Sequence, residues 1–215
     1  MKTKHIVLQG VGAVLLAACA SAPEPVVTEA TIQRVVQSSF SQIEYQYPPE
    51  VVARTNQDEG QKMCTAVRNE VAKIPPAQLD AFVGKSMKEI KYPAGGELMG
   101  DWKQGENIAQ SGYGMRFGEG ADDPKRPNGG NCYACHQVAP QEIAFGTIGP
   151  SLLGYGKHRG ASAAMQKFVY DKVYNAWVTF PCSNMPRFGH HGFLTTEQIT
   201  HVVALLLDPA SPVNK

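Results

Sequence analysis

Cys132-Tyr133-Ala134-Cys135-His136 places two thiols and an imidazole in the order Cys-x-x-Cys-His. This order and spacing are typical of the attachment site of a c-type haem. The thiols add across the two vinyl groups at one edge of the porphyrin, and the next side chain, His136, then points at the iron as the proximal ligand. The motif therefore predicts one covalently bound haem c.

Two other interpretations of the motif stay open at this point. A structural zinc site needs four protein ligands, and no second Cys or His pair follows at short spacing. A thiol redox pair is usually found in a thioredoxin-like βαβ pattern, and the flanking sequence has none. Both interpretations fail if a haem is covalently attached.

The composition indicates a folded, loop-rich globular protein. The chain has 215 residues with a net charge of +1, 18% charged residues, 21 Gly and 15 Pro. Because no large excess of either charge is present, nucleic acid is not expected as a partner.

The first residues read as an export signal. Lys2 and Lys4 precede an apolar stretch over 6–18 that is too short for a transmembrane helix. We therefore interpret 1–19 as a signal peptide and expect the mature protein in the periplasm, where disulfides can form.

The end of this signal has the form of a bacterial lipobox. In Leu16-Ala17-Ala18-Cys19 the cysteine would become the lipidated first residue, and several acyl chains would give stable anchoring to a membrane. The alternative is ordinary cleavage after Ala20 or Ala22, which would leave a soluble periplasmic protein.

The remaining cysteines are Cys64 and Cys182. With Cys19 assigned to the signal or the lipid and Cys132 and Cys135 to the haem, two thiols are left in an oxidising compartment. We expect them to form a disulfide.

Hydrophobic periodicity predicts a mostly α fold, because strand signals are nearly absent. Helices are expected over 28–40, 57–73, 76–90, 98–110 and 162–177, and a last helix begins after Thr195 and ends before Pro209. In the last helix Thr195 and Gln198 have capping-box spacing, and a continuous apolar stripe follows: Ile199, Val202, Val203, Leu206 and Leu207.

The predicted helices suggest a division of the chain. A tether and helical extension would occupy 20–96, and the domain that carries the motif would occupy 97–215. Within it the Gly-rich stretch 111–131 is expected to form an irregular loop, and a long loop of this kind often has a binding role.

Met185 is the expected second axial ligand of the iron. It lies in a proline-stiffened loop between two predicted helices, and its thioether would stabilise ferrous iron. His190, His191 and Cys182 are alternative ligands in the same region.

A metal-bound histidine usually donates its other ring N–H to a carbonyl oxygen. The backbone carbonyl of Pro150 is the candidate acceptor for His136, although Pro150 can equally be only a turn residue.

The order of these motifs resembles the class I cytochrome c family: Cys-x-x-Cys-His, then Gly149-Pro150-Ser151-Leu152, a Met-Pro loop and a final amphipathic helix. From residue 57 to the end the chain more specifically resembles SoxX, the small monohaem subunit of the SoxXA cytochrome complex of bacterial sulfur oxidation. The segments that carry this resemblance are 100–103, 129–136, 146–152, 185–189 and 207–215.

The resemblance implies a class I cytochrome c domain whose first helix, around residues 105–108, packs across the last one. It also implies a role in an L-cysteine S-thiosulfotransferase, which oxidatively couples thiosulfate to a cysteine of a SoxYZ-type carrier. The catalytic cysteine-ligated haem would belong to the partner SoxA chain, with no catalytic residue in this chain. This subunit would pass the electrons to a downstream soluble cytochrome.

Two rival functions stay open. The first is a stand-alone or lipid-anchored electron carrier to a terminal oxidase. The second is a haem catalyst whose sixth ligand is labile.

Overall fold

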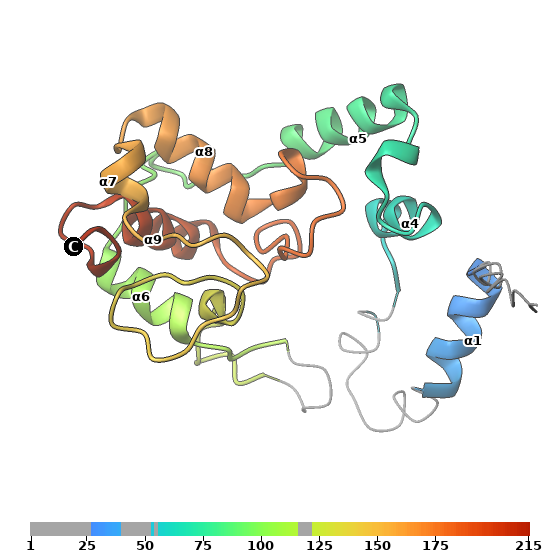
Figure 1. Ribbon diagram of the computed structural model, residues 1–215, viewed down its shortest axis with the longest axis horizontal. Coiled ribbons are helices and arrows are strands. Elements are labelled where there is room, and N and C mark those ends of the chain that lie inside the picture. Colours follow the sequence, from blue (N-terminus) through green and yellow to red (C-terminus); the bar gives the residue numbers. More distant parts are fainter. Residues whose placement is uncertain (1–26, 40–52, 54–55, 116–121) are drawn as a thin grey trace, which may run out of the picture.

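The computed structural model describes residues 27–39, 53, 56–115 and 122–215 (Figure 1). The expected signal peptide with Cys19, and most of the tether that follows it, lie outside these residues. Where it is described, the chain is mostly helical and contains no strand, which confirms the predicted mostly α fold. The helices are α1 (Glu29–Ser39), α4 (Glu59–Ala66), α5 (Pro76–Lys88), α6 (Trp102–Gln110), α7 (Tyr155–Arg159), α8 (Ala163–Tyr174) and α9 (Thr196–Leu207).

Helices α6 and α9 form the most extensive helix pair in the described part of the chain. They approach closely at Gly105, where a Cβ atom would lie 2.1 Å from the carbonyl oxygen of His201. Asp101 caps α6, and its backbone N–H donates to Nδ1 of His201 at 2.9 Å. Because a Cβ atom at position 105 would overlap the His201 carbonyl, only glycine fits where the two helices cross.

Helix α9 is the centre of the main hydrophobic core. The predicted capping box between Thr195 and Gln198 is present, and the predicted stripe is buried. Thr200, Ala204 and Leu205 are buried as well, so α9 is covered on more sides than an amphipathic helix at a surface. The neighbouring α8 contributes Val169, Tyr170, Val173 and Tyr174 to the same core.

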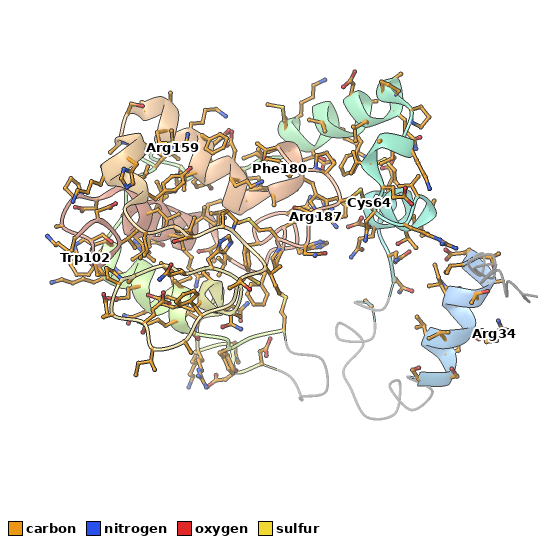
Figure 2. All side chains as sticks on the ribbon, in the orientation of Figure 1. Arg34, Cys64, Trp102, Arg159, Phe180 and Arg187 are labelled. Atoms are coloured by element: carbon orange, nitrogen blue, oxygen red, sulfur yellow. A yellow bond between two sulfur atoms is a disulfide. The ribbon has the colours of Figure 1, made fainter. Side chains whose placement is uncertain are left out.

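The N-terminal extension packs beside this core through a second, smaller cluster. Its buried members are Cys64, Ile74, Ala176, Trp177 and Cys182. The structure contains the expected disulfide between Cys64 and Cys182, which joins α4 to the loop before Met185 (Figure 2). Phe82 of α5 lies 6.1 Å from the Trp177 ring, measured between centroids. Helix α1 has no buried residue.

Three predicted helices have different ends in the structure. The helix expected over 57–73 stops at Ala66, because Arg68 and Asn69 adopt left-handed backbone conformations before the 3₁₀ turn η2 (Val71–Lys73). The helix expected from residue 98 starts at Trp102, after its cap Asp101.

The third of these helices, expected over 162–177, stops at Tyr174. The Asn175 side chain then accepts from Trp177 N–H and starts η4 (Ala176–Val178). Three short elements were not predicted: α7 and the 3₁₀ turns η3 (Cys132–Ala134) and η5 (Pro212–Asn214).

Candidate haem site

The Cys-x-x-Cys-His motif forms a single tight turn. Asn131 adopts a left-handed conformation with φ 46°, and η3 (Cys132–Ala134) follows. The backbone N–H groups of Cys135 and His136 both donate to the Cys132 carbonyl, at 3.1 and 2.9 Å. Both thiols are partly buried and unpaired, whereas Cys64 and Cys182 are bonded to each other. The motif thus keeps both sulfurs available for another bond.

The surroundings of Cys132 disfavour its thiolate form. Burial raises the pKa of the Cys132 thiol to about 12. Reactive cysteines of disulfide exchange have lowered pKa values, because the thiolate is the nucleophile. The buried thiol therefore weakens the interpretation of the motif as a thiol redox pair.

The segment 146–152 holds the motif from one side. Backbone N–H groups of Gly146, Gly149 and Leu152 donate to the carbonyls of Tyr133, Cys135 and Gln137, at 2.9, 2.8 and 2.8 Å. These hydrogen bonds fix the motif to the segment 146–152, which contains Pro150.

His136 lies against this segment as the sequence predicts. Its Nδ1 is 2.7 Å from the carbonyl oxygen of Pro150, which is the expected hydrogen bond. A Cβ atom on Gly149 would lie 2.1 Å from Cε1 of His136, so only glycine leaves room for the ring here. With Nδ1 donating to Pro150, the lone pair on Nε2 is left for a metal.

Met185 lies at the junction of the two hydrophobic clusters. It is partly buried and packs against both, and Cys132 packs against the first of them. Its loop is held by the disulfide at Cys182 and by a 2.9 Å hydrogen bond from Nε1 of Trp177 to the Ser183 carbonyl. Since Cys182 is in the disulfide, its thiolate is not free to be an alternative ligand.

The other two alternative ligands, His190 and His191, face the extension. Their Nε2 atoms lie 3.9 and 3.8 Å from Oδ2 of Asp58, and Nδ1 of His190 lies 3.7 Å from Oε2 of Glu89. Burial, with the nearby Arg187 charge, lowers the pKa of both imidazoles. Both rings therefore already have carboxylate neighbours in this structure.

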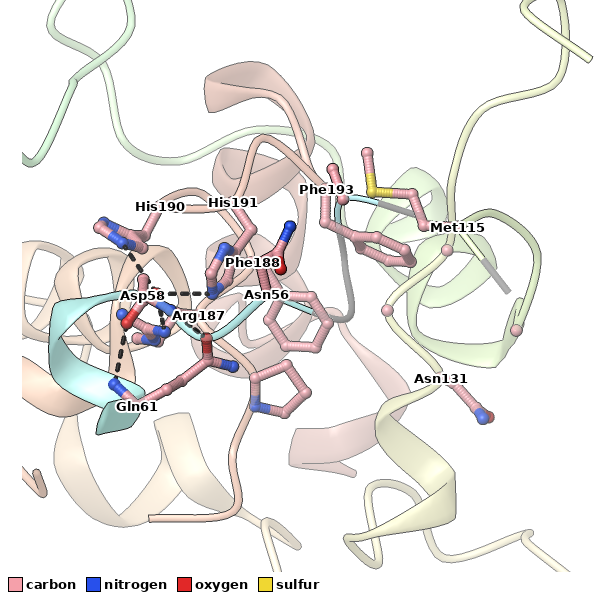
Figure 3. A pocket seen from close by; sticks show the side chains of 15 residues that line it. Asn56, Asp58, Gln61, Met115, Asn131, Arg187, Phe188, His190, His191 and Phe193 are labelled. Carbon is pink, nitrogen blue, oxygen red and sulfur yellow. Dashed lines mark hydrogen bonds and ion pairs between the residues drawn. The ribbon is translucent and has the colours of Figure 1, made fainter. Parts of the chain in front are cut away.

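A cavity of about 830 Å³ lies between the motif and the loop after Met185 (Figure 3). Gly129, Gly130 and Asn131 line one side, and Pro186 and Phe188 line another. Figure 3 also shows Met115 and Phe193 on its border. The cavity adjoins the segment before Cys132 and the segment after Met185, but Cys132, Cys135, His136 and Met185 are not among its lining residues. The fit of the residues to a haem therefore rests on the unpaired thiols and on Nε2 of His136.

The described parts of the Gly-rich loop, 111–115 and 122–131, form neither helix nor strand, and Gly112, Met115 and residues 129–131 line this cavity. Asn131 N–H donates to the Ser111 carbonyl at 2.9 Å, and Gly129 N–H donates to the Tyr113 carbonyl at the same distance. The two arms of the loop are therefore held together beside the motif.

A comparison with models of known protein families gives no match. Among curated proteins, an uncharacterized lipoprotein of Aquifex aeolicus (strain VF5) is 44% identical over 163 residues, which are 74% of this chain and 73% of that protein. The chain belongs to the family of this lipoprotein. In the described part of this family member, no helix is long and apolar enough to cross a bilayer.

The sequence interpretation missed the acidic partners of the site. Asp58 accepts from Gln61 N–H in a capping box and forms an ion pair with Arg187, which is 4% exposed. The guanidinium of Arg187 also stacks on Trp177 at 4.1 Å. The Asp58-x-x-Gln61 spacing was a usable capping signal, but nothing in the sequence paired Asp58 with a residue 129 positions away.

Proposed function

We propose that this protein is a c-type cytochrome with a class I fold, whose haem is attached to Cys132 and Cys135 and ligated by His136 and Met185. One observation carries the proposal: both motif thiols are unpaired, while the Pro150 carbonyl fixes the His136 ring through Nδ1. The close α6–α9 crossing agrees with the packing that the resemblance implies.

A haem bound here would supply a one-electron redox centre. The protein's part is to keep its ligands in place in both oxidation states. Pro150 orients His136, and the disulfide and Trp177 hold the loop of Met185. A site whose ligands are restrained in this way suits electron transfer better than binding and turnover of a substrate.

We further propose that the protein is the electron-transfer subunit of a SoxXA-type thiosulfate-oxidising complex. The support is the resemblance of five separate segments to SoxX, combined with a cavity that lies between the motif and the disulfide-linked extension. The partners would be a SoxA-type haem subunit, a SoxYZ-type carrier and a downstream soluble cytochrome.

The lipoprotein relative supports an anchored, extracytoplasmic location. Together with Leu16-Ala17-Ala18-Cys19 it favours lipidation of Cys19 over cleavage after Ala20 or Ala22. The same observation favours the second candidate function, a lipid-anchored cytochrome that donates electrons to a terminal oxidase.

Gentle purification from the native host, with intact masses of every co-purifying species, tests these proposals. A mass one haem above the processed polypeptide would support the cytochrome assignment, and its absence would refute it. A stoichiometric second c-type cytochrome with an extra sulfur on a cysteine would support the SoxXA role. The haem-loaded protein recovered alone would favour the anchored carrier.

A further inference from the structure

Three metal-ligating side chains converge next to the cavity, outside the set Cys132, Cys135, His136 and Met185. Asp58, His190 and His191 each offer one ligand atom, and these three atoms all lie within 4.8 Å of one another. Figure 3 shows both imidazoles directed at the Asp58 carboxylate. Ligand atoms about 2 Å from a zinc ion lie roughly 3 to 3.5 Å apart, so small side-chain rotations would close this group around an ion.

The surroundings of these ligands have the features of an outer ligand shell. Metal-bound imidazoles usually donate their second ring N–H to a carboxylate or a carbonyl. In His190 the nitrogen directed away from Asp58, Nδ1, faces Oε2 of Glu89 at 3.7 Å. Asp58 is itself oriented by Gln61 N–H, which donates to Oδ1 at 2.9 Å. These contacts leave the inward-facing atoms of His190 and Asp58 directed at one point.

We propose that Asp58, His190 and His191 bind one divalent transition-metal ion, of which Zn²⁺ is the reference. Two imidazole nitrogens and one carboxylate oxygen are a ligand set suited to Zn²⁺ and to neighbouring first-row divalent ions. Three protein ligands leave a coordination position for water, as in zinc sites that exchange ligands.

The open position would face the cavity, because Asp58, His190 and His191 all line it. A small molecule in the cavity therefore has access to the ion.

Arg187 limits the strength of this site without blocking it. Its guanidinium donates to Oδ2 of Asp58, and a carboxylate oxygen has a second lone pair for a metal. The nearby positive charge lowers the affinity, so we expect weaker binding than at a four-ligand structural site. The site uses none of the proposed haem ligands and does not depend on the proposed function.

Isothermal titration of Zn²⁺ into the purified full chain, with the Cys64–Cys182 disulfide intact, tests the site, with zinc counted after dialysis. We expect one Zn²⁺ per chain. His190→Ala and His191→Ala should each weaken binding at least about tenfold, and the double variant should abolish it. Glu89→Gln replaces the exposed carboxylate that faces Nδ1 of His190 by an amide, with little risk to folding. It should lower the affinity for Zn²⁺ by about 10- to 100-fold. His158→Ala, at an exposed histidine of α7, is the matched control and should leave binding unchanged.

X-ray absorption at the zinc edge identifies the ligands. Nitrogen and oxygen neighbours only, with an imidazole signature lost in the double variant, would support the proposal. Sulfur neighbours would overturn it and would show that Cys132 and Cys135 carry no haem, which is a separate failure of the proposed function. Absence of bound zinc, or binding equal in the double variant and in His158→Ala, would also overturn it.

Discussion

Asp58 is the residue on which several parts of the structure converge. It caps α4, pairs with the buried Arg187 and faces two histidines. Burial opposes ionisation of its carboxyl, but the hydrogen bonds from Gln61 N–H and Arg187, with the Arg187 charge, outweigh burial and lower its pKa. The ionised carboxylate therefore stabilises the folded chain.

We expect Asp58→Asn to lower the free energy of unfolding by about 2 to 3 kcal/mol at neutral pH, because Arg187 would keep its charge without a partner. The amide oxygen can still cap α4, so the loss reports mainly the ion pair. Chemical denaturation measures it, and Asp80→Asn, at an exposed position of α5, should change little.

The same pair makes stability depend on pH. The folded pKa of Asp58 lies below its ordinary value of 3.8, so the contribution is full well above pH 3.8 and is lost as pH falls through the folded value. The difference in free energy of unfolding between wild type and Asp58→Asn should therefore become smaller as the pH falls. If this difference stays constant down to the pH at which the protein unfolds in acid, the ionised pair is not its cause.

Met185→Ala tests the proposed axial ligand. Loss of the thioether should lower the reduction potential and let cyanide or carbon monoxide bind the iron readily, as redox titration and absorption spectra would show. Met87→Ala, at an exposed methionine of α5, is the control. Unchanged spectra in Met185→Ala would assign the ligand to His190 or His191.

At the scale of helices, the crossing of α6 and α9 depends on a missing side chain. Gly105→Ala places a methyl group against the His201 carbonyl and should cost about 1 to 3 kcal/mol as the helices separate. Gly84→Ala is the matched change in α5, where a Cβ meets nothing within 4 Å, and should stabilise by about 0.5 to 1 kcal/mol. Gly105→Ala should therefore lower the unfolding temperature, and Gly84→Ala should raise it. Equal shifts in the two variants would contradict the tight crossing of α6 and α9.

Helix positions followed from the sequence better than helix ends did. The capping box at Thr195 and the proline at residue 76 located α9 and α5 closely, because these signals act within one turn. The end of α4 depends instead on left-handed Arg68 and Asn69, and neither residue is a glycine that would have marked it. Asn adopts this conformation more readily than most residues but Arg does not, so periodicity alone extended the helix too far.

At the scale of the whole molecule, the Cys64–Cys182 disulfide closes a loop of 118 residues. Cys64→Ser should lower the free energy of unfolding by about 4 to 5 kcal/mol in the chain-entropy model. It should also release one thiol at Cys182, countable with a thiol reagent after denaturation. Lack of a new thiol would contradict the pairing.

Lipidation also acts at the scale of the molecule. If Cys19 carries acyl chains, Cys19→Ser should move the protein from the membrane fraction to the soluble one, as fractionation and immunodetection would show. An unsubstituted protein that is already soluble would exclude the anchor.

The sequence by itself determined the mostly α class, the unpaired motif thiols and the cap of α9, and it offered Pro150 as a candidate partner of His136. Each follows from neighbouring residues in the chain, from the number and spacing of the cysteines, or from a short motif with a fixed geometry. Only the tertiary structure decided that Asp58 lies next to Arg187, His190 and His191 beside a cavity. The same holds for the contact between Glu89 and His190. The physical reason is that such contacts depend on how the extension packs on Trp177 and the disulfide, and no local pattern encodes that packing.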